Sequence, residues 1–238
     1  MQLPSGAFPL GTDAPGRDVL SRVLHGGAEI ILLSVVATVL GCGVGVAVGL
    51  LSGYAAGLVD TVLMRIADTF MSVPSIIFAL VLFAAAGATP TLLVVAVAVG
   101  HAPRMARIVR GVSLDVVTLD FVTAAATRGE RLIYILRKEL LPNLLPPILV
   151  EFSLRLGYSV LSIAALAFLG FGLQPPDADW GGMINENRDA LTIQPWSVLV
   201  PALLIGLLTA AVALIGDGLT RAVGRHGGQI GEQKGSDR

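Results

Sequence analysis

Few side chains in this sequence have the type and spacing that catalysis or metal binding requires. The chain contains three histidines and one cysteine, and Cys42 lies in an apolar run, so neither a disulfide framework nor a thiolate metal site is available. His101 has no companion at ligand spacing, which favours a polar packing role. The G-x-x-x-x-G-K-[ST] loop, the H-E-x-x-H pair and any Ser, His or Asp constellation in apolar sequence are absent. We therefore expect that the chain itself hydrolyses nothing and binds no cofactor.

The composition places these residues in a membrane protein. Of 238 residues, 54% are hydrophobic and only 14% are charged, which exceeds what a soluble domain needs to fill its core. The net charge is −1 and the basic residues are clustered by loop, so a nucleic-acid partner is not expected. Residues 1–27 are polar and rich in glycine and proline, without the pattern of a cleavable signal peptide.

Uncharged runs of sequence predict an all-α integral membrane fold, a bundle of about five spans. A helix needs roughly 20 mostly apolar residues to cross a bilayer. The run 69–103 is too long for one helix and carries the turn residues G-A-T-P at 87–90, so it predicts two spans. Pro74 and Pro103 are expected to kink or start helices. The spans are expected at about 29–60, 64–86, 91–109, 144–173 and 198–215.

Two patterns inside these spans suggest packing. Gly41, Gly45, Gly49 and Gly53 recur at every fourth residue and would place a small-residue stripe on one helix face. A phosphate-binding loop at G-C-G-V-G has the wrong spacing and would leave backbone groups unpaired in lipid. The second pattern is Glu151 and Arg155, which are four residues apart and can form an ion pair. That pair is either a structural pair or part of a polar path, and its place at a span entrance favours structure.

The segment 121–150 differs from the spans, and we expect it to face a partner. It has small residues at Thr123, Ala124, Ala125 and Ala126, a break at Gly129, an amphipathic helix and a proline stop at Pro142. In that helix the apolar and the charged positions fall on opposite faces. They are Leu132, Ile133, Leu136 and Leu140 against Glu130, Arg131, Arg137 and Lys138. Such a helix can also lie flat on a bilayer surface, so an interfacial linker remains an alternative.

The same segment resembles the cytoplasmic EAA loop of permease subunits of ATP-binding-cassette importers. That pattern is E-A-A, three residues, G, nine residues, I, one residue and L-P. Five residues match at this spacing: Ala124, Ala125, Gly129, Leu141 and Pro142. Thr123 replaces the glutamate and Glu139 replaces the isoleucine. In the family this loop forms a coupling helix that sits in a groove of the ATPase subunit, so the resemblance implies an ATPase contact at 123–129 that lacks one polar group.

Two further stretches resemble the dipeptide, oligopeptide and nickel branch of these permeases. One is L-G-T-D-x-x-G-R-D-V-L-S-R at 10–22, and the other is F-L-G-F-G-L-Q-P-P at 168–176, followed by Trp180-Gly181, N-R-D at 187–189 and Pro195-Trp196. The resemblance implies a type I importer permease fold. The family usually has one more span before the first stretch, so either the chain is naturally short or an N-terminal piece is absent.

The basic residues give the expected orientation. With 104–138 in the cytoplasm, 12 of the 16 Lys and Arg residues lie inside, as the positive-inside rule requires. The expected organisation has an extracytoplasmic polar segment and pre-span helix at 1–27 and a transmembrane domain at 28–220, with the coupling loop at about 115–143. A cytoplasmic tail follows at 221–238, expected to be disordered after Arg225. The loop 174–196 is soluble in character and would face outside.

The function expected from the resemblance is that of a cell-membrane permease for di- or oligopeptides. It would act with a second homologous permease, two ATPase subunits that hold ATP and Mg, and an extracytoplasmic binding protein. An importer of nickel or a metal chelate is the alternative within the family. An ion-coupled secondary transporter would call for charges near mid-span and an inverted repeat, and neither is visible in the sequence.

Overall fold

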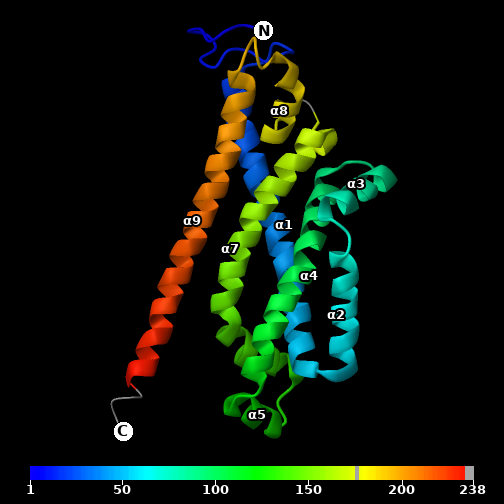
Figure 1. Cartoon of the computed structure of the whole chain (residues 1–238), viewed down its shortest axis with the longest axis vertical. Helices are drawn as coiled ribbons and strands as arrows, with labels where there is room; N and C mark the ends of the chain where they lie inside the picture. Colours follow the sequence, from blue (N-terminus) through cyan, green and yellow to red (C-terminus); the bar gives the residue numbers. More distant parts are fainter. Residues whose placement is uncertain (175–176, 234–238) are drawn as a thin grey trace. The chain divides into compact units, whose positions relative to one another are not determined.

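The structure, a computed structural model, describes residues 1–174 and 177–233, and the described part is helical. Outside the helices it shows one isolated antiparallel bridge, between Thr12 and Asp18. Figure 1 labels the main helices along the chain. In chain order the elements are α1 (Val19–Ala55), α2 (Gly57–Met71), α3 (Ser75–Ala86), α4 (Pro90–Val117), α5 (Asp120–Thr127), α6 (Leu132–Tyr134), the π-helical turn η1 (Ile135–Leu140), α7 (Leu141–Leu166), the π-helical turn η2 (Ala167–Phe171), α8 (Trp180–Asn187), the 3-10 turn η3 (Arg188–Ala190) and α9 (Trp196–Gln233).

The number of spans agrees with the sequence. Among the described residues, four helices are long and apolar enough to cross a membrane, or five when α2 and α3 together count as one span. The expected span at 64–86 is nevertheless not one straight helix, because the chain bends by 82° between α2 and α3. Pro74 explains the break, since it lacks an N–H group and disfavours helical backbone at Val73. The expected turn before α4 is present, with Gly87 at a φ of +81°.

The ends of the first and last helices differ from expectation. α1 begins at Val19 and ends at Ala55, where Ala56 and Gly57 both adopt positive φ, so the uncharged run up to Asp60 is not all one helix. α9 continues to Gln233, so the expected disorder after Arg225 is wrong for residues 226–233. No proline follows Pro201, and adding a residue to an existing helix costs far less than starting a new one. The tail residues 234–238 lie outside the described part.

The chain divides into two compact units, of which the first comprises residues 1–40, 73–100 and 156–210. Its core contains Ile30, Phe83, Ile163 and Met183, and the rings of Phe83 and Phe171 stack with centroids 5.3 Å apart. Two hydrogen bonds join distant polar groups within this unit. The Trp180 indole N–H donates to the carbonyl of Val23 at 2.8 Å, and the hydroxyls of Thr38 and Ser159 bond at 2.7 Å.

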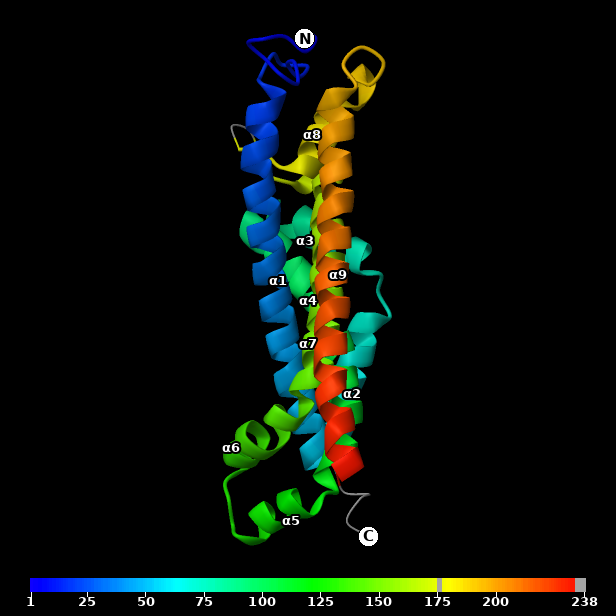
Figure 2. The ribbon, with the colours of Figure 1, turned by 90° about the vertical axis from the view of Figure 1, so that its left-hand side faces the viewer.

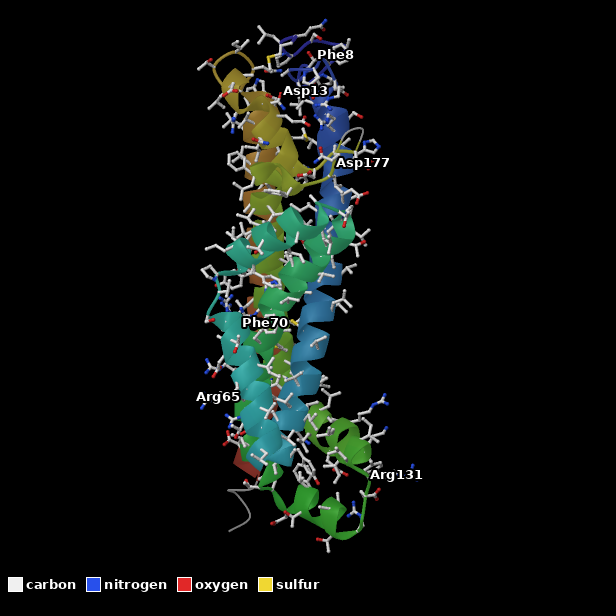
Figure 3. The ribbon with its side chains drawn as sticks, turned by 90° about the vertical axis from the view of Figure 1, so that its right-hand side faces the viewer. Phe8, Asp13, Arg65, Phe70, Arg131 and Asp177 are labelled. Atoms are coloured by element: carbon white, nitrogen blue, oxygen red, sulfur yellow. The ribbon has the colours of Figure 1, made fainter. Side chains whose placement is uncertain are left out.

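A charge cluster in the first unit fastens the N-terminal segment. Asp13, labelled in Figure 3, has a fully buried side chain and accepts hydrogen bonds from Arg17 Nε and Arg22 Nη1, both at 2.8 Å. Glu186 on α8 pairs with the same two arginines, with Arg22 at 2.6 Å. The side chain of Gln194 adds a bond to the Leu10 carbonyl at 2.8 Å. Residues 174–196 are therefore an ordered cap containing α8, wherever the structure describes them, rather than an open loop.

The residue that starts α8 is a second buried carboxyl in this unit. Asp179 is the N-cap of α8 and accepts hydrogen bonds from the backbone N–H groups of Gly182 at 2.6 Å and Leu173 at 3.1 Å. These bonds lower the pKa of Asp179, but loss of water contact is the larger effect and the pKa is raised overall. The bonds fix where α8 begins, because they satisfy donors that the first turn of a helix leaves open.

The second unit comprises residues 41–72, 101–155 and 211–238, and its helices approach closely at glycine. A Cβ on Gly45, Gly49 or Gly53 would lie 2.4 to 2.6 Å from an α4 atom, whereas Gly43 has open space around it. Gly41 is buried as well. Two ion pairs join α2 to α4 in this unit: Asp60 with Arg110 at 2.5 Å and Asp68 with Arg107 at 3.0 Å. Gly45, Gly49 and Gly53 therefore face α4 at the distance that small side chains permit.

The ionisable residues that the sequence placed in the spans of this unit are buried. Glu151 and Arg155 form an ion pair within α7, and each side chain is only 11% exposed. His101 on α4 is 5% exposed. Among the described residues, no three His, Cys, Asp or Glu side chains come together in a way that could hold a metal ion. A buried and paired Glu151 fits the structural role that its position suggested.

Gly49→Ala is expected to destabilise the protein by about 2 kcal/mol, because its Cβ would overlap the Ala106 carbonyl oxygen and α1 and α4 would have to separate. The measurement is thermal unfolding in detergent. Gly43→Ala on the same helix is the matched control and should not be destabilised, since nothing lies within 4 Å of its Cβ position. Equal stability of the two variants would contradict the packing described for the glycines.

Asp13→Asn is expected to lower the free energy of unfolding by about 3 kcal/mol, because it leaves the buried Arg22 guanidinium with Glu186 as its only carboxylate partner. Limited proteolysis in detergent should then cut within residues 1–18 faster than in the parent chain. Asp189→Asn removes an equal charge from a side chain that is 96% exposed, and it should leave the cleavage rate unchanged. Unchanged protection of the Asp13→Asn variant would show that the cluster does not hold the segment.

Candidate functional site

The candidate site is the short helix α5 with the loop that follows it, both in the second unit. α5 begins after Leu119, and Asp120 stands in its first turn, where a carboxylate interacts favourably with the helix dipole. The alanines at 124–126 carry little side-chain entropy and favour helix. The sequence therefore predicts this helix correctly from its small residues.

Gly129 ends α5 in a Schellman motif. Its φ of +77° is left-handed, a conformation that costs any residue with a Cβ atom. The N–H of Glu130 donates to the Ala125 carbonyl at 3.2 Å, and the N–H of Gly129 donates to the Ala126 carbonyl at 3.0 Å. These two bonds define the motif. They satisfy carbonyls that the last turn would leave open and turn the chain toward the next helix, so the break expected at Gly129 is confirmed.

One face of α5 is anchored and the other is exposed. Val122 and Ala125 are 2% and 0% exposed and lie in the core of the second unit with Ile135, Leu136 and Leu140. The exposed residues of α5 are Asp120, Phe121, Thr123, Ala124, Ala126 and Thr127. Ala125 was expected on the small-residue surface, and that placement is wrong, because a helix this short can present only part of its circumference to a partner. We call Thr123, Ala124 and Ala126 the exposed face of α5.

The helix after the loop differs from its expected amphipathic form. Ile135, Leu136 and Leu140 are buried, but Leu132 and Ile133, expected on the apolar face, are 45% and 58% exposed. The π-helical turn explains the difference, because its longer repeat rotates the first residues away from the buried stripe. Figure 2 shows α5 and α6 beside one another at the same end of the second unit. Leu141 is half-buried against the same core, and Pro142 is exposed.

Pro142 does not stop the helix, so the expected proline stop is wrong. The helix continues to Leu166, with Pro146 and Pro147 also inside it. In a regular α-helix Pro142 would deprive the Lys138 carbonyl of its donor. The turn before it is π-helical instead, with the Leu141 N–H donating to the Leu136 carbonyl five residues back. The side-chain amide of Asn143 also donates to the Glu139 carbonyl, at 2.6 Å.

Gly129→Val is expected to loosen the end of α5, since a β-branched residue in the left-handed region costs about 2 kcal/mol. The space around Gly129 is open, so the effect would come from the backbone alone. Hydrogen exchange should show faster exchange at the amides of 128–130. Gly129→Asn is the matched control, because asparagine tolerates this conformation, and its amides should remain nearer the parent rate. Equal exchange in both variants would remove the Schellman motif from the explanation.

Curated relatives match nearly the whole chain. The glutathione transport system permease protein GsiD of Pectobacterium atrosepticum is 39% identical over 220 residues, which cover 92% of this chain and 73% of the relative. The dipeptide transport system permease protein DppC of Haemophilus influenzae is 32% identical, with 91% and 74% covered. The probable D,D-dipeptide transport system permease protein DdpC of Escherichia coli is 37% identical, with 91% and 72% covered.

Solved structures show the same fold. A chain of the MetNI methionine ABC transporter in an inward-facing conformation superposes with a TM-score of 0.69 at 22% identity, covering 89% of this chain and 99% of that one. A chain of an amino acid ABC transporter gives a TM-score of 0.60 at 17% identity, covering 85% and 94%. The family model described as binding-protein-dependent transport system inner membrane component matches residues 45–226. This chain, with its apolar spans and short anchored helix, therefore belongs to that family of multi-pass transport permeases and is not an enzyme.

Proposed function

We propose that this chain is one permease subunit of an ATP-driven importer for short peptides. The relatives that match over more than nine tenths of the chain are transport permeases for glutathione, dipeptides and D,D-dipeptides. These substrates are small and peptide-like, and the chain is 32% to 39% identical to the permeases that carry them. The shared substrate chemistry supports a di- or oligopeptide as cargo.

Membership of the family implies partners as well as a membrane. The name of the family indicates a substrate-binding protein, and an ATP-binding-cassette importer requires ATPase subunits. We infer one further homologous permease and two ATPase subunits, which would hold the ATP and Mg. The last apolar helix supports a second permease or lipid as a neighbour, because only 6% of its most apolar window is buried within this chain. Leu199, Leu203 and Leu207 are among its exposed side chains.

The observation that carries the proposed mechanism is the division of α5 into an anchored and an exposed face. An ATPase subunit would contact Thr123, Ala124 and Ala126, whose small side chains allow two backbones to approach closely. Val122 and Ala125 would pass the movement to α7 through the buried residues of η1. Closure of the ATPase dimer can shift the equilibrium between two permease conformations. The size of the shift is set by how much more tightly the closed dimer binds one of them than the other.

The positive-inside rule supports the proposed orientation. Under this rule α5 and the C-terminus would be in the cytoplasm, and the Asp13 cluster would be outside, on the side of the binding protein. In that arrangement the two units of the chain carry different tasks. The cap that contains α8 would belong to the side where substrate arrives, and α5 to the side where ATP is hydrolysed.

Ala124→Arg is the test of this function. The substitution puts a long charged side chain on the exposed face of α5 and leaves the core of the second unit intact, so the protein should insert and fold normally. Peptide uptake by the full transporter in proteoliposomes should fall at least roughly 100-fold, because a clash that costs about 3 kcal/mol at a docking surface shifts an equilibrium by that factor. ATP hydrolysis is measured in the same vesicles.

Two comparisons complete the experiment. Gly218→Arg changes an exposed position on α9, beyond the apolar span that ends at Gly216, where nothing lies within 4 Å of the Cβ position, and its uptake should remain near the parent level. Ala125→Arg should instead fail to fold, because Ala125 is fully buried. Normal uptake by a folded Ala124→Arg transporter would show that α5 does not couple ATP hydrolysis to transport. Copurification of the parent chain without any ATPase subunit would refute the importer itself.

A further inference from the structure

A groove lies beside α5, at the start of the helix that runs from Leu132 to Phe171. It has a volume of about 730 Å³ and is lined by residues of the loop, α6 and η1. Its polar lining includes Arg131, Arg137 and Lys138, and its apolar lining includes Ile133, Tyr134 and Leu141. Ile133 and Tyr134 are 58% and 41% exposed. One surface of this unit therefore combines three cations with exposed apolar side chains.

The three cations of the groove are not neutralised by the protein. Within residues 1–174 and 177–233, Arg131, Arg137 and Lys138 have no carboxylate within salt-bridge distance, whereas Arg107 and Arg110 in the same unit pair with Asp68 and Asp60. The one acidic residue in the groove, Glu130, lies 3.8 Å from Arg128. Figure 3 shows the side chain of Arg131 extending away from the ribbon. The groove is thus a net positive site that an anion would complement.

The position of the groove favours a lipid as the source of that anion. The helix that it begins has 40 residues, about 60 Å at 1.5 Å per residue, and this exceeds the roughly 30 Å of hydrocarbon that it crosses. Its first turns carry the consecutive charges Arg137, Lys138 and Glu139, so they are the part that extends beyond the hydrocarbon. Tyrosine is favoured at this depth, and basic clusters beside a span attract anionic lipids of the cytoplasmic leaflet.

We propose that this groove binds an anionic glycerophospholipid, with Arg137 and Lys138 on the phosphate and with Ile133 and Leu141 against the upper acyl chain. The site is distinct from the exposed face of α5, whose residues are small and uncharged. The inference rests on the cytoplasmic orientation in the proposed function. A bound lipid would fix the start of the helix next to α5, and therefore the height of α5 above the membrane.

The test is a titration of phosphatidylglycerol into the purified full chain in detergent, with the bound lipid counted by native mass spectrometry. In the Arg137→Gln/Lys138→Gln double variant the affinity should fall roughly 25-fold, about fivefold for each charge removed. Phosphatidylcholine should bind weakly to both proteins, and inorganic phosphate should not displace phosphatidylglycerol, because it lacks the acyl chains.

Two variants control for charge and folding. Arg65→Gln/Arg221→Gln removes two exposed cations that do not line the groove and should keep the parent affinity. The charge exchange Arg137→Lys/Lys138→Arg should also keep it. The lipid site would be overturned if Arg65→Gln/Arg221→Gln lost as much affinity for phosphatidylglycerol as Arg137→Gln/Lys138→Gln. It would also be overturned if Arg137→Gln/Lys138→Gln kept the parent affinity.

The same preparations distinguish a protein occupant. If the groove variant loses its ATPase subunits but binds phosphatidylglycerol like the parent, the groove contacts the ATPase and the lipid proposal is wrong. The lipid titration needs only the folded chain. It therefore stands even when the parent copurifies with no ATPase, a result that would refute the proposed function alone.

Discussion

The candidate site depends on the packing of Val122 and Ala125 against the core of the second unit. α5 has only eight residues, and a helix of that length is not stable in water by itself. Its stability comes from the core of the second unit, where these two side chains meet Ile135, Leu136 and Leu140. The coupling role proposed for α5 relies on this anchoring, because only a helix that is packed on its neighbour can pass a displacement to it.

Backbone hydrogen bonding explains how the rest of that segment is arranged. Lipid offers no partner for an open N–H or carbonyl group, so a helix that enters it must satisfy its own. Gly129 closes the end of α5 with the two bonds of a Schellman motif, and in the π-helical turn before Pro142 the Leu141 N–H donates to the Leu136 carbonyl. Both irregular points lie in the segment that connects α5 to the apolar helix Leu132–Phe171.

In the first unit, the buried charges of Asp13 and Arg22 are paired with one another. Arg17 and Arg22 share the carboxylates of Asp13 and Glu186, which join a segment at the start of the chain to a cap some 170 residues later. The second unit uses Asp60 with Arg110 and Asp68 with Arg107 in a similar way, between α2 and α4. The cations of the groove have no such partners among the described residues. That difference is the reason to look for a ligand from outside the chain.

Much of the fold could be predicted because lipid imposes simple rules on sequence. Uncharged runs located the spans, and Gly87 and Gly129 marked turns, since only glycine adopts their backbone conformations without cost. The expected fold and family were confirmed by the relatives and by the solved structures. The coupling role of Thr123, Ala124, Ala125, Ala126, Gly129, Leu141 and Pro142 remains a prediction.

Local sequence could not decide which side of a helix is covered. The small residues at 124–126 look alike in the sequence, and only packing against η1 buries Ala125 and leaves its neighbours exposed. The effect of Pro142 depends on the turn before it, and the core fixes that turn as π-helical. From the sequence alone, Pro142 therefore predicts the end of a helix. Asp13 and Glu186 show no pairing pattern along the chain. The sequence by itself determined which segments enter the membrane and where the backbone must turn, whereas the tertiary structure decided which faces are buried, because burial depends on neighbours that lie far away in the sequence.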